Sequence, residues 1–421
     1  MLQVSHIREN RQAVIDALAK RKVDALDQID LAISLDDKRK HAQFTLDQNL
    51  AEAKRIASEI GRMMKEGNSA GANSAKEKTS ELKKYNQELE LELRQLEKDL
   101  LDLLATIPNT PHSSVPEGRN SEDNETVRSW GEASDAKHAT PHWDLAKTYG
   151  LIDFELGVKI TGAGFPVYLG KGAKLQRALI QFFLDEAEAA GYSEIIPPLM
   201  INADSGFGTG QLPDKDGQMY HATVDDLFLI PTAEVPITNI YRGVILSETD
   251  LPIKNAGYTP CFRREAGSYG KEVRGLNRLH QFDKVEIVQI VSPEKSYETL
   301  ESMVLHVENL LQKLNLPYRV LRLCGGDMGF TSALTYDLEV YSRGQGRWLE
   351  VSSVSNFETF QANRMKLRIK NHEGKNQLAH TLNGSALALP RILAAILENN
   401  FDGETIRIPA CLIPYTKFET I

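Results

Sequence analysis

The sequence has few cysteines and no long run of apolar residues. Its three cysteines among 421 residues, Cys261, Cys324 and Cys411, are too few and too widely spaced for a disulfide framework, so we expect reduced thiols. None has a second cysteine or a histidine at zinc-ligand spacing, so no zinc site is expected. Because no stretch of about 18 apolar residues occurs, we expect no membrane span. The first residues are charged rather than apolar, which argues against a secretory signal and predicts a cytoplasmic protein.

The chain also lacks an excess of positive charge and the glycine-rich loops that commonly hold phosphates. Its formal net charge is −9. Nonspecific nucleic-acid binding depends on many Lys and Arg side chains, so this balance argues against a protein that coats nucleic acid nonspecifically but is compatible with a local basic surface. Neither Gly-x-x-x-x-Gly-Lys-Ser/Thr nor Gly-x-Gly-x-x-Gly occurs, so a bound nucleotide must be held mainly by side chains and sheet edges.

Apolar residues recur mostly every three or four positions in two long segments near the amino terminus. They are Leu46, Leu50, Ala53, Ala57, Ile60 and Met64, followed by Leu82, Tyr85, Leu89, Leu93, Leu96, Leu100, Leu103 and Ile107. This spacing is typical of a coiled coil, and the polar segment Glu66–Ser74 suits a reversal of direction. We predict an antiparallel coiled-coil hairpin over about residues 36–107, within a first domain of residues 1–110.

Two roles for this hairpin are open at the level of sequence. Helices of roughly 30 residues would extend on the order of 45 Å, so the hairpin can be an arm that reaches a ligand, or it can be a dimerisation zipper. Its charges do not decide, since Lys38–Lys40 and Lys83–Lys84 are offset by glutamates in the second segment. A short amphipathic helix around Ile7–Leu18 is expected to pack at the base of the hairpin.

A change of composition marks the start of a second domain, expected over residues 111–421. Pro108–Trp143 is rich in Pro, Ser, Asn and acidic residues, as linkers are. Beyond it, a helical pattern over Lys174–Ala190 is combined with β-rich runs joined by short or irregular loops. The runs are Leu227–Ile230, Lys284–Val291, Tyr318–Leu323, Thr335–Val340 and Trp348–Val351. Such connections favour an α+β fold with an antiparallel sheet flanked by helices.

The segment Thr259–Glu286 combines two expected strands with a polar, glycine-punctuated loop. Arg263 and Arg278 can bind phosphate oxygens through their planar guanidinium groups, and the loop at Ser268–Gly275 can close over a ligand. Phe282 offers a flat face to a purine. This arrangement suits a nucleoside triphosphate, and the alternative is an exposed hairpin with surface ion pairs.

Three further segments suit the same chemistry. Gly191–Pro198 ends a long helical pattern and turns into a strand. Glu350 and Ser353 supply hard oxygen ligands of the kind that Mg²⁺ prefers. Asn383–Glu398 predicts a strand and a tight turn that lead into a helix, whose early Arg391 would face the site.

These segments together resemble, in order and spacing, the three signature motifs of class II aminoacyl-tRNA synthetases. With the helical hairpin in front, the chain resembles the bacterial-type seryl-tRNA synthetases from its amino terminus to about residue 410. The most specific matches are Thr232–Pro236, Thr259–Glu286 and Ser352–Arg364. The resemblance implies that serine and ATP give seryl-adenylate and pyrophosphate, and that the terminal ribose 3′-hydroxyl of tRNA then takes the seryl group.

The resemblance implies that three arginines hold the phosphates of ATP. Arg263 would hold the α-phosphate, while Arg278 and Arg391 would hold the β- and γ-phosphates in a bent shape. Glu350 and Ser353 would coordinate the Mg²⁺ that accompanies ATP. The serine carboxylate is already ionised at pH 7, so catalysis would consist of positioning and charge stabilisation.

The same resemblance assigns the adenine contacts. Phe282 would stack on the base, Glu265 would accept a hydrogen bond from its exocyclic amine, and the backbone of Leu279 would contact the ring edge. The complete expected ATP-binding set is Arg263, Arg264, Glu265, Arg278, Leu279, Phe282, Glu350, Val351, Ser352, Ser353 and Arg391.

A serine pocket is implied as well. Glu286 would bind the serine hydroxyl, Thr381 or Ser385 would close the pocket, and Glu234 with Thr232 would receive the ammonium group. A buried carboxylate left without the hydroxyl would reject alanine, and lack of space would reject threonine. The complete expected set is Thr232, Ala233, Glu234, Arg263, Glu286, Thr381 and Ser385.

Both glutamates also have structural alternatives. Glu286 could pair with Lys284 or Arg274 instead of a substrate. Glu234 could cap a helix that begins near Val235.

The sequence departs from the family pattern at three positions. Ala386 stands where the third motif generally has glycine, Pro390 directly precedes Arg391, and Val354 replaces a frequent cysteine. Proline is well tolerated in the first turn of a helix, so we expect the helix to start near Pro390.

The resemblance implies a homodimer in which the arm of one subunit grips tRNA(Ser), and commonly also tRNA(Sec), while the acceptor end enters the other subunit. Gly191–Pro198, typical of the dimer interface, supports this. One alternative is a relative that loads an amino acid onto a carrier protein, but such relatives generally lack the long arm. Another is a non-enzymatic RNA-binding or regulatory protein, which the presence of Arg263, Glu286, Glu350 and Arg391 argues against.

Overall fold

The computed structural model describes residues 1–133, 139–265 and 273–421. Contacts divide the chain into two compact units. The first comprises Met1–Ala19 and Val23–Pro108, and the second comprises Lys20–Lys22 and Asn109–Ile421. The predicted loop Ser268–Gly275 lies outside the described residues up to position 272. Within the described ranges, every helix is too short or too polar to cross a bilayer.

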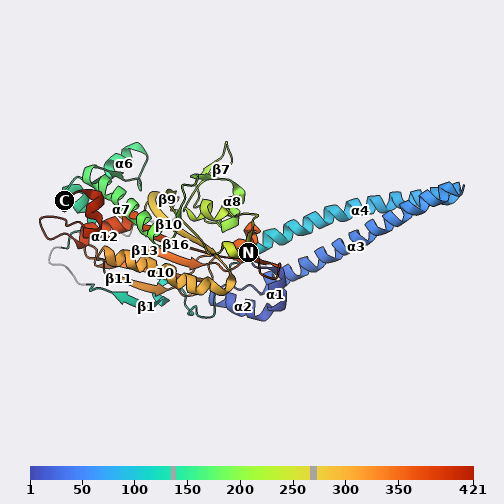
Figure 1. The fold of residues 1–421 in the computed structure, drawn as a ribbon, viewed down its shortest axis with the longest axis horizontal. Coiled ribbons are helices and arrows are strands. Elements are labelled where there is room, and N and C mark those ends of the chain that lie inside the picture. The colour runs from blue at the N-terminus through green and yellow to red at the C-terminus, as the bar shows by residue number, and fades with distance from the viewer. Residues whose placement is uncertain (134–138, 266–272) are drawn as a thin grey trace. The chain divides into compact units, whose positions relative to one another are not determined.

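The first unit is built from helices. They are α1 (Val4–Glu9), α2 (Arg11–Lys20), α3 (Leu26–Lys65) and α4 (Ser69–Leu104). Figure 1 shows α3 and α4 running side by side as a long hairpin, which confirms the predicted helical pair. At 40 residues, α3 is about 60 Å long. The expected helix around Ile7–Leu18 is split at Asn10, and α4 begins inside the predicted turn, where the Asn68 side chain accepts a hydrogen bond from the backbone N–H of Gly71 (3.0 Å).

Helix α3 begins earlier than predicted, at Leu26, and Asp36 is a buried charge among its buried apolar residues. Its buried carboxylate contacts Arg8 (3.0 Å), Arg39 (2.8 Å) and Lys40 (2.8 Å). Burial alone would raise the pKa of Asp36, but the hydrogen bonds from Lys40, Arg39 and Arg8 lower it to about 2. A buried charge with its own partners leaves no trace in apolar periodicity.

An eight-stranded sheet lies at the centre of the second unit. Its strands, in spatial order, are β1 (Glu125–Trp130), β11 (Tyr318–Arg322), β12 (Leu334–Ser342), β13 (Arg347–Asn356), β16 (His380–Ala388), β10 (Gln281–Val291), β9 (Ile253–Phe262) and β4 (Ser193–Glu194). Neighbouring strands are antiparallel except β4, which runs parallel to β9. The predicted α+β architecture with an antiparallel sheet is therefore confirmed.

Smaller sheets and helices surround this sheet. The smaller sheets contain β14 (Arg368–Lys370), β15 (Asn376–Leu378) and β8 (Ile245–Ser247); β2 (Ile152–Asp153) and β3 (Val167–Tyr168); and β5 (Met200–Ile201), β7 (Leu227–Leu229) and β6 (His221–Ala222). The α-helices are α5 (His142–Thr148), α6 (Phe154–Ile160), α7 (Gly170–Ala189), α8 (Ala203–Thr209), α9 (Glu234–Asn239), α10 (Ser296–Lys313), α11 (Phe360–Met365), α12 (Leu389–Asn399) and α13 (Ile413–Thr416). Short 3₁₀ turns lie at Ser121–Asp123, Glu248–Asp250, Pro293–Lys295 and Ala410–Leu412.

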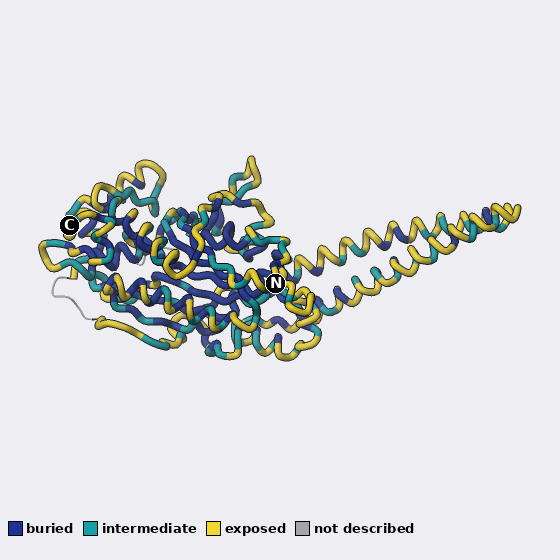
Figure 2. The backbone as a smooth tube through the Cα atoms, in the orientation of Figure 1, coloured by how far each residue is buried: buried dark blue, intermediate teal, exposed yellow. Residues whose placement is uncertain are grey.

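The two faces of the sheet differ in character. On β10, Val285 and Ile287 belong to the main hydrophobic core, together with buried residues of α7, α10 and α12. Glu286 and Val288 point to the opposite face, because successive side chains of a strand alternate. Figure 2 shows the central strands buried along most of their length. One face thus packs against α7, α10 and α12, and the other carries polar groups and also packs against α9, where Ile237 meets Val288.

Part of the predicted linker belongs to the sheet. The sequence predicts a linker over Pro108–Trp143, but β1 pairs with β11, with Glu125 opposite Arg322. Most β1 side chains are exposed, because the strand lies at the edge of the sheet. It therefore lacks the apolar alternation by which a half-buried strand is recognised, and the linker prediction was wrong for Glu125–Trp130.

The burial of α7 generates a stability prediction. Phe183 on α7 is fully buried in the main core, so replacing it with alanine is expected to cost ~3–5 kcal/mol. We expect Phe183→Ala to lower the melting temperature by about 5 °C or more in calorimetry. Leu305→Ala, at an exposed position of α10, is the control and should melt close to the wild type. Equal melting of the two variants would contradict the assigned core.

Candidate active site

Glu286 lies at the centre of a buried polar cluster on the open face of β10. Its side chain is 1% exposed and forms an ion pair with Lys284, which lies two residues earlier on the same face. Asn383 donates from Nδ2 to Glu286 Oε1 (3.0 Å), and Thr232 Oγ1 lies 3.4 Å from Oε2. Lys284 Nζ also donates to Thr232 Oγ1 (2.9 Å). The register fixes this cluster, because Glu286 lies opposite Ser385 where β10 pairs with β16.

Glu234 adds a second buried carboxyl group to the cluster. Gln361 Nε2 donates to Glu234 Oε1 (2.7 Å), and Thr381 Oγ1 donates to Gln361 Oε1 (2.7 Å). Burial, followed by the negative charge of Glu286, raises the pKa of Glu234 to about 7, against the opposing effects of the Gln361 hydrogen bond and nearby cations. The Glu234 carboxyl group therefore changes its protonation state near neutral pH, and a bound cation would favour the ionised form.

The hairpin of β9 and β10 places Arg263 beside Phe282. Arg263 Nε donates to the carbonyl of Pro231 (3.2 Å), and its guanidinium carbon lies 5.2 Å from the centroid of the Phe282 ring. Arg264 points elsewhere, with its guanidinium carbon 5.6 Å from the centroid of the Tyr220 ring. The hairpin thus brings one cation and one aromatic platform together at its end.

Glu265 and Arg278 meet across the base of the hairpin loop. They form an ion pair, and Glu265 has a φ of +48°, a conformation that is uncommon for residues other than glycine. Both line a cavity of about 690 Å³, and the described lining also includes Leu279, Trp143 and Phe165. Arg263, Phe282, Glu350 and Arg391 are not among its described lining residues, so the cavity adjoins only part of the expected ATP-binding set.

A bulge in β13 explains how Glu350 and Ser353 come to share a face. The register with β12 shifts here and leaves Val351 without a partner. Val351 and Val354 both pack in the main core although they are three residues apart. Glu350 and Ser353 therefore emerge together on the opposite face.

Asp337 extends this oxygen-rich group. It lies opposite Ser353 in the pairing of β12 with β13, and its Oδ1 is buried without a hydrogen-bond partner in the described part of the chain. Burial, followed by the charge of Glu350, raises the pKa of Asp337 well above its usual range, although a hydrogen bond with Ser353 opposes this. A buried carboxylate oxygen of this kind needs a proton or a cation.

Arg391 connects the oxygen-rich group to the base of the hairpin loop. From the first turn of α12, its Nη1 donates to the Glu350 carbonyl (2.6 Å) and lies 3.5 Å from Glu350 Oε2. Its Nε donates to the carbonyl of Asn277 (3.1 Å), the residue that precedes Arg278. Arg278 and Arg391, which are far apart in the sequence, are thus carried by segments that are in direct contact.

The other expected site residues occupy supporting positions. Thr381 and Ser385 lie on β16, and Ser352 Oγ donates to the Ser385 carbonyl (2.6 Å). Ala233 is fully buried directly before α9, and Val351 belongs to the core. These placements bring the segments together without testing the role of any single side chain.

The alternatives for the two glutamates can be compared with the observed contacts. Glu286 does pair with Lys284, and this pair lies in the same buried cluster as Thr232. Arg274 is not its partner, because the guanidinium carbon of Arg274 lies 4.7 Å from the centroid of the Trp143 ring. Glu234 lies in the first turn of α9, and its side chain bonds Gln361.

Three residues of the site were given no role from the sequence: Gln361, Asn383 and Asp337. Asn383 could have been found from alternation, because it lies between Thr381 and Ser385 on the same face of β16. Gln361 depends on Glu234, which lies far away in the chain, and Asp337 depends on the register of the β12–β13 hairpin, which the bulge in β13 shifts. Of the departures from the family pattern, Val354 and Ala386 are buried in the core, and α12 begins at Leu389, as predicted near Pro390.

The raised pKa of Glu234 predicts a pH-dependent change in stability. The folded state retains the proton more tightly than the unfolded chain, whose carboxyl has a pKa near 4.5, so this stabilisation is complete below about 4.5 and is lost as the pH rises through about 7. Glu234→Gln keeps an acceptor for Gln361 without the charge. We expect the variant to melt like the wild type at pH 5 and a few degrees higher at pH 8.

The control is Glu298→Gln, at an exposed glutamate, which should show no such trend. If the Glu234→Gln variant and the wild type differed equally at both pH values, the buried carboxyl would not be the group that titrates.

Two family descriptions match the chain: "Seryl-tRNA synthetase N-terminal domain" over residues 1–111, and "tRNA synthetase class II core domain (G, H, P, S and T)" over residues 220–400. The serine–tRNA ligase of Salinibacter ruber is 48% identical, with 100% of this chain and 99% of that protein covered. That of Methylacidiphilum infernorum is also 48% identical, with 100% of both covered.

Solved structures of seryl-tRNA synthetases also resemble this chain. The crystal structure of seryl-tRNA synthetase from Pyrococcus horikoshii complexed with ATP has a TM-score of 0.93 and 35% identity, covering 100% of this chain and 99% of the other. The cytoplasmic serine–tRNA ligase from Naegleria fowleri in complex with AMP has a TM-score of 0.89 and 26% identity, covering 100% and 98%. The chain therefore belongs to the seryl-tRNA synthetase family of class II aminoacyl-tRNA synthetases.

Proposed function

We propose that this protein activates L-serine with ATP and transfers it to tRNA(Ser). The observation that carries the proposal is Glu286, a buried carboxylate surrounded by Thr232, Lys284 and Asn383 on the open face of the sheet. Its two oxygens offer about four acceptor positions, so a serine hydroxyl can be added to these contacts. Alanine lacks this donor and would leave the pocket without it, which is the basis of selection.

Glu234 and Thr232 would receive the ammonium group of serine. The pKa of Glu234, raised to about 7, makes a cationic ligand favourable there, because the ligand charge replaces the proton. Arg263 lies beside the same cluster and would hold the α-phosphate of ATP. The ionised serine carboxylate would attack the α-phosphorus, an O–P bond to serine would form, and the bond to pyrophosphate would break.

Phe282, Arg278 and Arg391 would hold the rest of ATP. Phe282 would stack on adenine, with Glu265 and the Leu279 backbone at the base edge. Arg278 and Arg391 would hold the β- and γ-phosphates. Phosphate oxygens would replace the protein carbonyl and carboxylate oxygens that these side chains contact without ATP, so each guanidinium group would remain paired. The 3′-hydroxyl of tRNA would then attack the seryl carbonyl, and AMP would leave.

Glu350 and Ser353 would hold the Mg²⁺ that accompanies ATP. The residues fit this ion, since they provide hard oxygen ligands on one face and the unpartnered Oδ1 of Asp337 lies across from Ser353. When bound, the ion would offset the negative charge of the phosphates. In the described ranges, His, Cys, Asp and Glu form no cluster of three or more that could hold a metal.

The first domain, residues 1–110, would bind tRNA through the α3–α4 hairpin, and residues 111–421 would form the catalytic domain. A homodimer would let the arm of one subunit present tRNA to the other. The apolar side chains of Val158 and Ile160 on α6, and of Ile196 within Gly191–Pro198, are exposed. They supply a surface suited to subunit contact. tRNA(Sec) is proposed as a second substrate, and the cytoplasm as the place of action.

Serine-dependent exchange of pyrophosphate into ATP tests the proposal. We expect exchange with serine and at least tenfold less activity with Glu286→Ala, because the hydroxyl acceptor is lost. Glu298→Ala, at an exposed glutamate, should retain wild-type exchange. Absence of exchange with every amino acid would refute the enzymatic proposal, and full activity of Glu286→Ala would remove that residue from the pocket.

Shortening the hairpin separates the two steps of the reaction. Removing residues 41–93 with a short Gly-Ser connection takes equal lengths from α3 and α4. Pyrophosphate exchange should stay within about twofold of wild type, whereas charging of tRNA(Ser) should fall by at least a hundredfold, because phosphate contacts along the arm are lost. Charging at the wild-type rate would show that the arm does not bind tRNA.

A further inference from the structure

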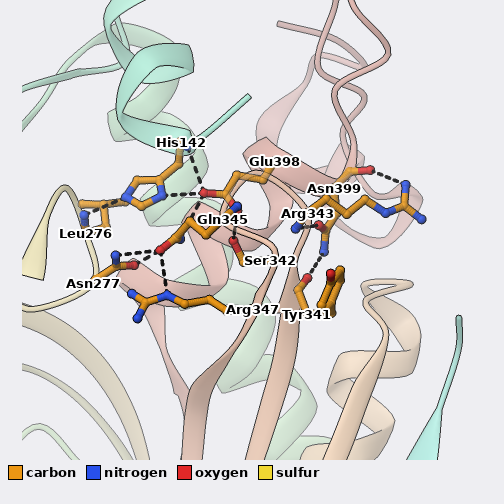
Figure 3. A network of polar contacts seen from close by, with 10 residues as sticks. All are labelled: His142, Leu276, Asn277, Tyr341, Ser342, Arg343, Gln345, Arg347, Glu398 and Asn399. Atoms are coloured by element: carbon orange, nitrogen blue, oxygen red, sulfur yellow. Dashed lines mark hydrogen bonds and ion pairs between the residues drawn. The ribbon is translucent and has the colours of Figure 1, made fainter. Parts of the chain in front are cut away.

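A buried polar network connects α5, the base of the hairpin loop and α12 (Figure 3). His142, the first residue of α5, and Glu398 of α12 both have fully buried side chains. Glu398 Oε1 accepts hydrogen bonds from the backbone N–H of His142 (2.9 Å) and from the ring at Nδ1 (2.7 Å). Its other oxygen accepts a hydrogen bond from Ser342. The roles described above for catalysis do not use this network.

The hydrogen bonds fix the state of the imidazole. The backbone N–H of Leu276 donates to His142 Nε2 (2.8 Å), so Nε2 must carry a lone pair. The proton therefore lies on Nδ1, where it is donated to Glu398. As a neutral ring held from one side by a carboxylate, His142 presents an acceptor to the loop base from the other side.

The loop base is fitted closely against α5. Gly275 has a φ of +68°, and a Cβ atom added there would lie 2.3 Å from His142 Nε2. The preceding Arg274 places its guanidinium carbon 4.7 Å from the centroid of the Trp143 ring. Gly275 thus meets two requirements, a left-handed backbone and space for the imidazole.

The network continues from Leu276 to both phosphate-facing arginines. Asn277 and Gln345 exchange amide hydrogen bonds (2.9 and 3.3 Å), and Gln345 Nε2 also donates to Glu398 Oε1 (3.2 Å). The carbonyl of Asn277 accepts from Arg391 Nε (3.1 Å), and Arg278 is the next residue in the chain. Figure 3 shows Gln345 and Asn277 lying between His142 and the start of β13.

We propose that His142, held by Glu398, is a positioning residue for ATP binding: its neutral imidazole fixes the Leu276 amide and thereby sets Arg278 and Arg391 at the spacing that the β- and γ-phosphates require. The inference rests on the proposed function for the identity of the ligand. The proposal gives a role in the first reaction step to His142, which lies outside the three motif segments, and to Glu398 at the end of α12. His142 does not touch the substrate, so its effect must appear in the affinity for ATP rather than for serine.

A pair of substitutions of similar size separates the hydrogen bond from packing. His142→Gln offers an amide oxygen that can accept the Leu276 N–H, whereas His142→Leu fills the space without an acceptor. In pyrophosphate exchange we expect His142→Leu to raise the KM for ATP about tenfold and to change the KM for serine less than twofold. His142→Gln should raise the KM for ATP less than about threefold. His306→Leu, at a histidine on α10 outside the network, should leave both KM values unchanged.

Calorimetric titration of Mg-ATP without serine provides a second readout and keeps the two proposals apart. The Kd for ATP should follow the KM, rising about tenfold in His142→Leu and less than threefold in His142→Gln. A wild type that binds ATP but shows no serine-dependent exchange would overturn the proposed function, and the titrations would still decide the role of His142. A wild type that does not bind ATP would overturn both.

Equal KM and Kd values for ATP in His142→Leu and the wild type would overturn the positioning role, as would equal losses in the Leu and Gln variants. If His142→Leu does not fold, Gln345→Ala decides, because Gln345 lies in a turn and its loss frees Asn277 without emptying the core. At least a twofold rise in the KM for ATP would support the proposal, and an unchanged KM would refute it.

Discussion

Burying two carboxyl groups within electrostatic reach of each other is the constraint on which this site depends. Glu286 lies on the open face of the sheet and Glu234 lies on α9, which packs against that face; removal from water disfavours the charged forms of both. Lys284 offsets the charge of Glu286, while Glu234 retains a proton near neutral pH. The protein thus stores an unfavourable arrangement that a small cationic ligand with a hydroxyl group would relieve. In the proposed pocket, selectivity for serine and a cost in stability would have the same origin.

The register of the sheet holds this arrangement in place. The polar residues of β10, β12, β13 and β16 reach the open face through the alternation of strand side chains, and those at the start of α9 are brought to it by the packing of that helix. Helices α7, α10 and α12 pack on the opposite face, so the strands that carry the site rest on a large apolar core. A site on strands is more rigid than one on loops, and catalysis by positioning requires this rigidity.

Sequence patterns predicted the elements that carry a strong periodic signal. The hairpin of α3 and α4, the strands β10 to β13 and the helix after β16 follow directly from apolar spacing and from the placement of proline. The exposed edge strand β1 was missed because few of its side chains are buried. The contact of Asp337 with Ser353 depends on the shifted register of the β12–β13 hairpin, and that of Gln361 with Glu234 joins two helices far apart in the chain; one sequence reveals neither. Motif residues such as Arg391 could be named from the sequence, but the route by which Asn277 joins it to Arg278 could not.

The bulge at Val351 has a consequence for how this sequence can change over time. Because the extra residue decides which side chains of β13 meet the core and which lie on the open face, inserting or deleting one residue here would exchange the two sets without altering any amino acid type. A point substitution in β13 changes one side chain, whereas a change of length would move the apolar side chains to the open face and the polar ones into the core. The placement of Glu350 and Ser353 on one face therefore depends on the number of residues between them as well as on the identities of the two residues.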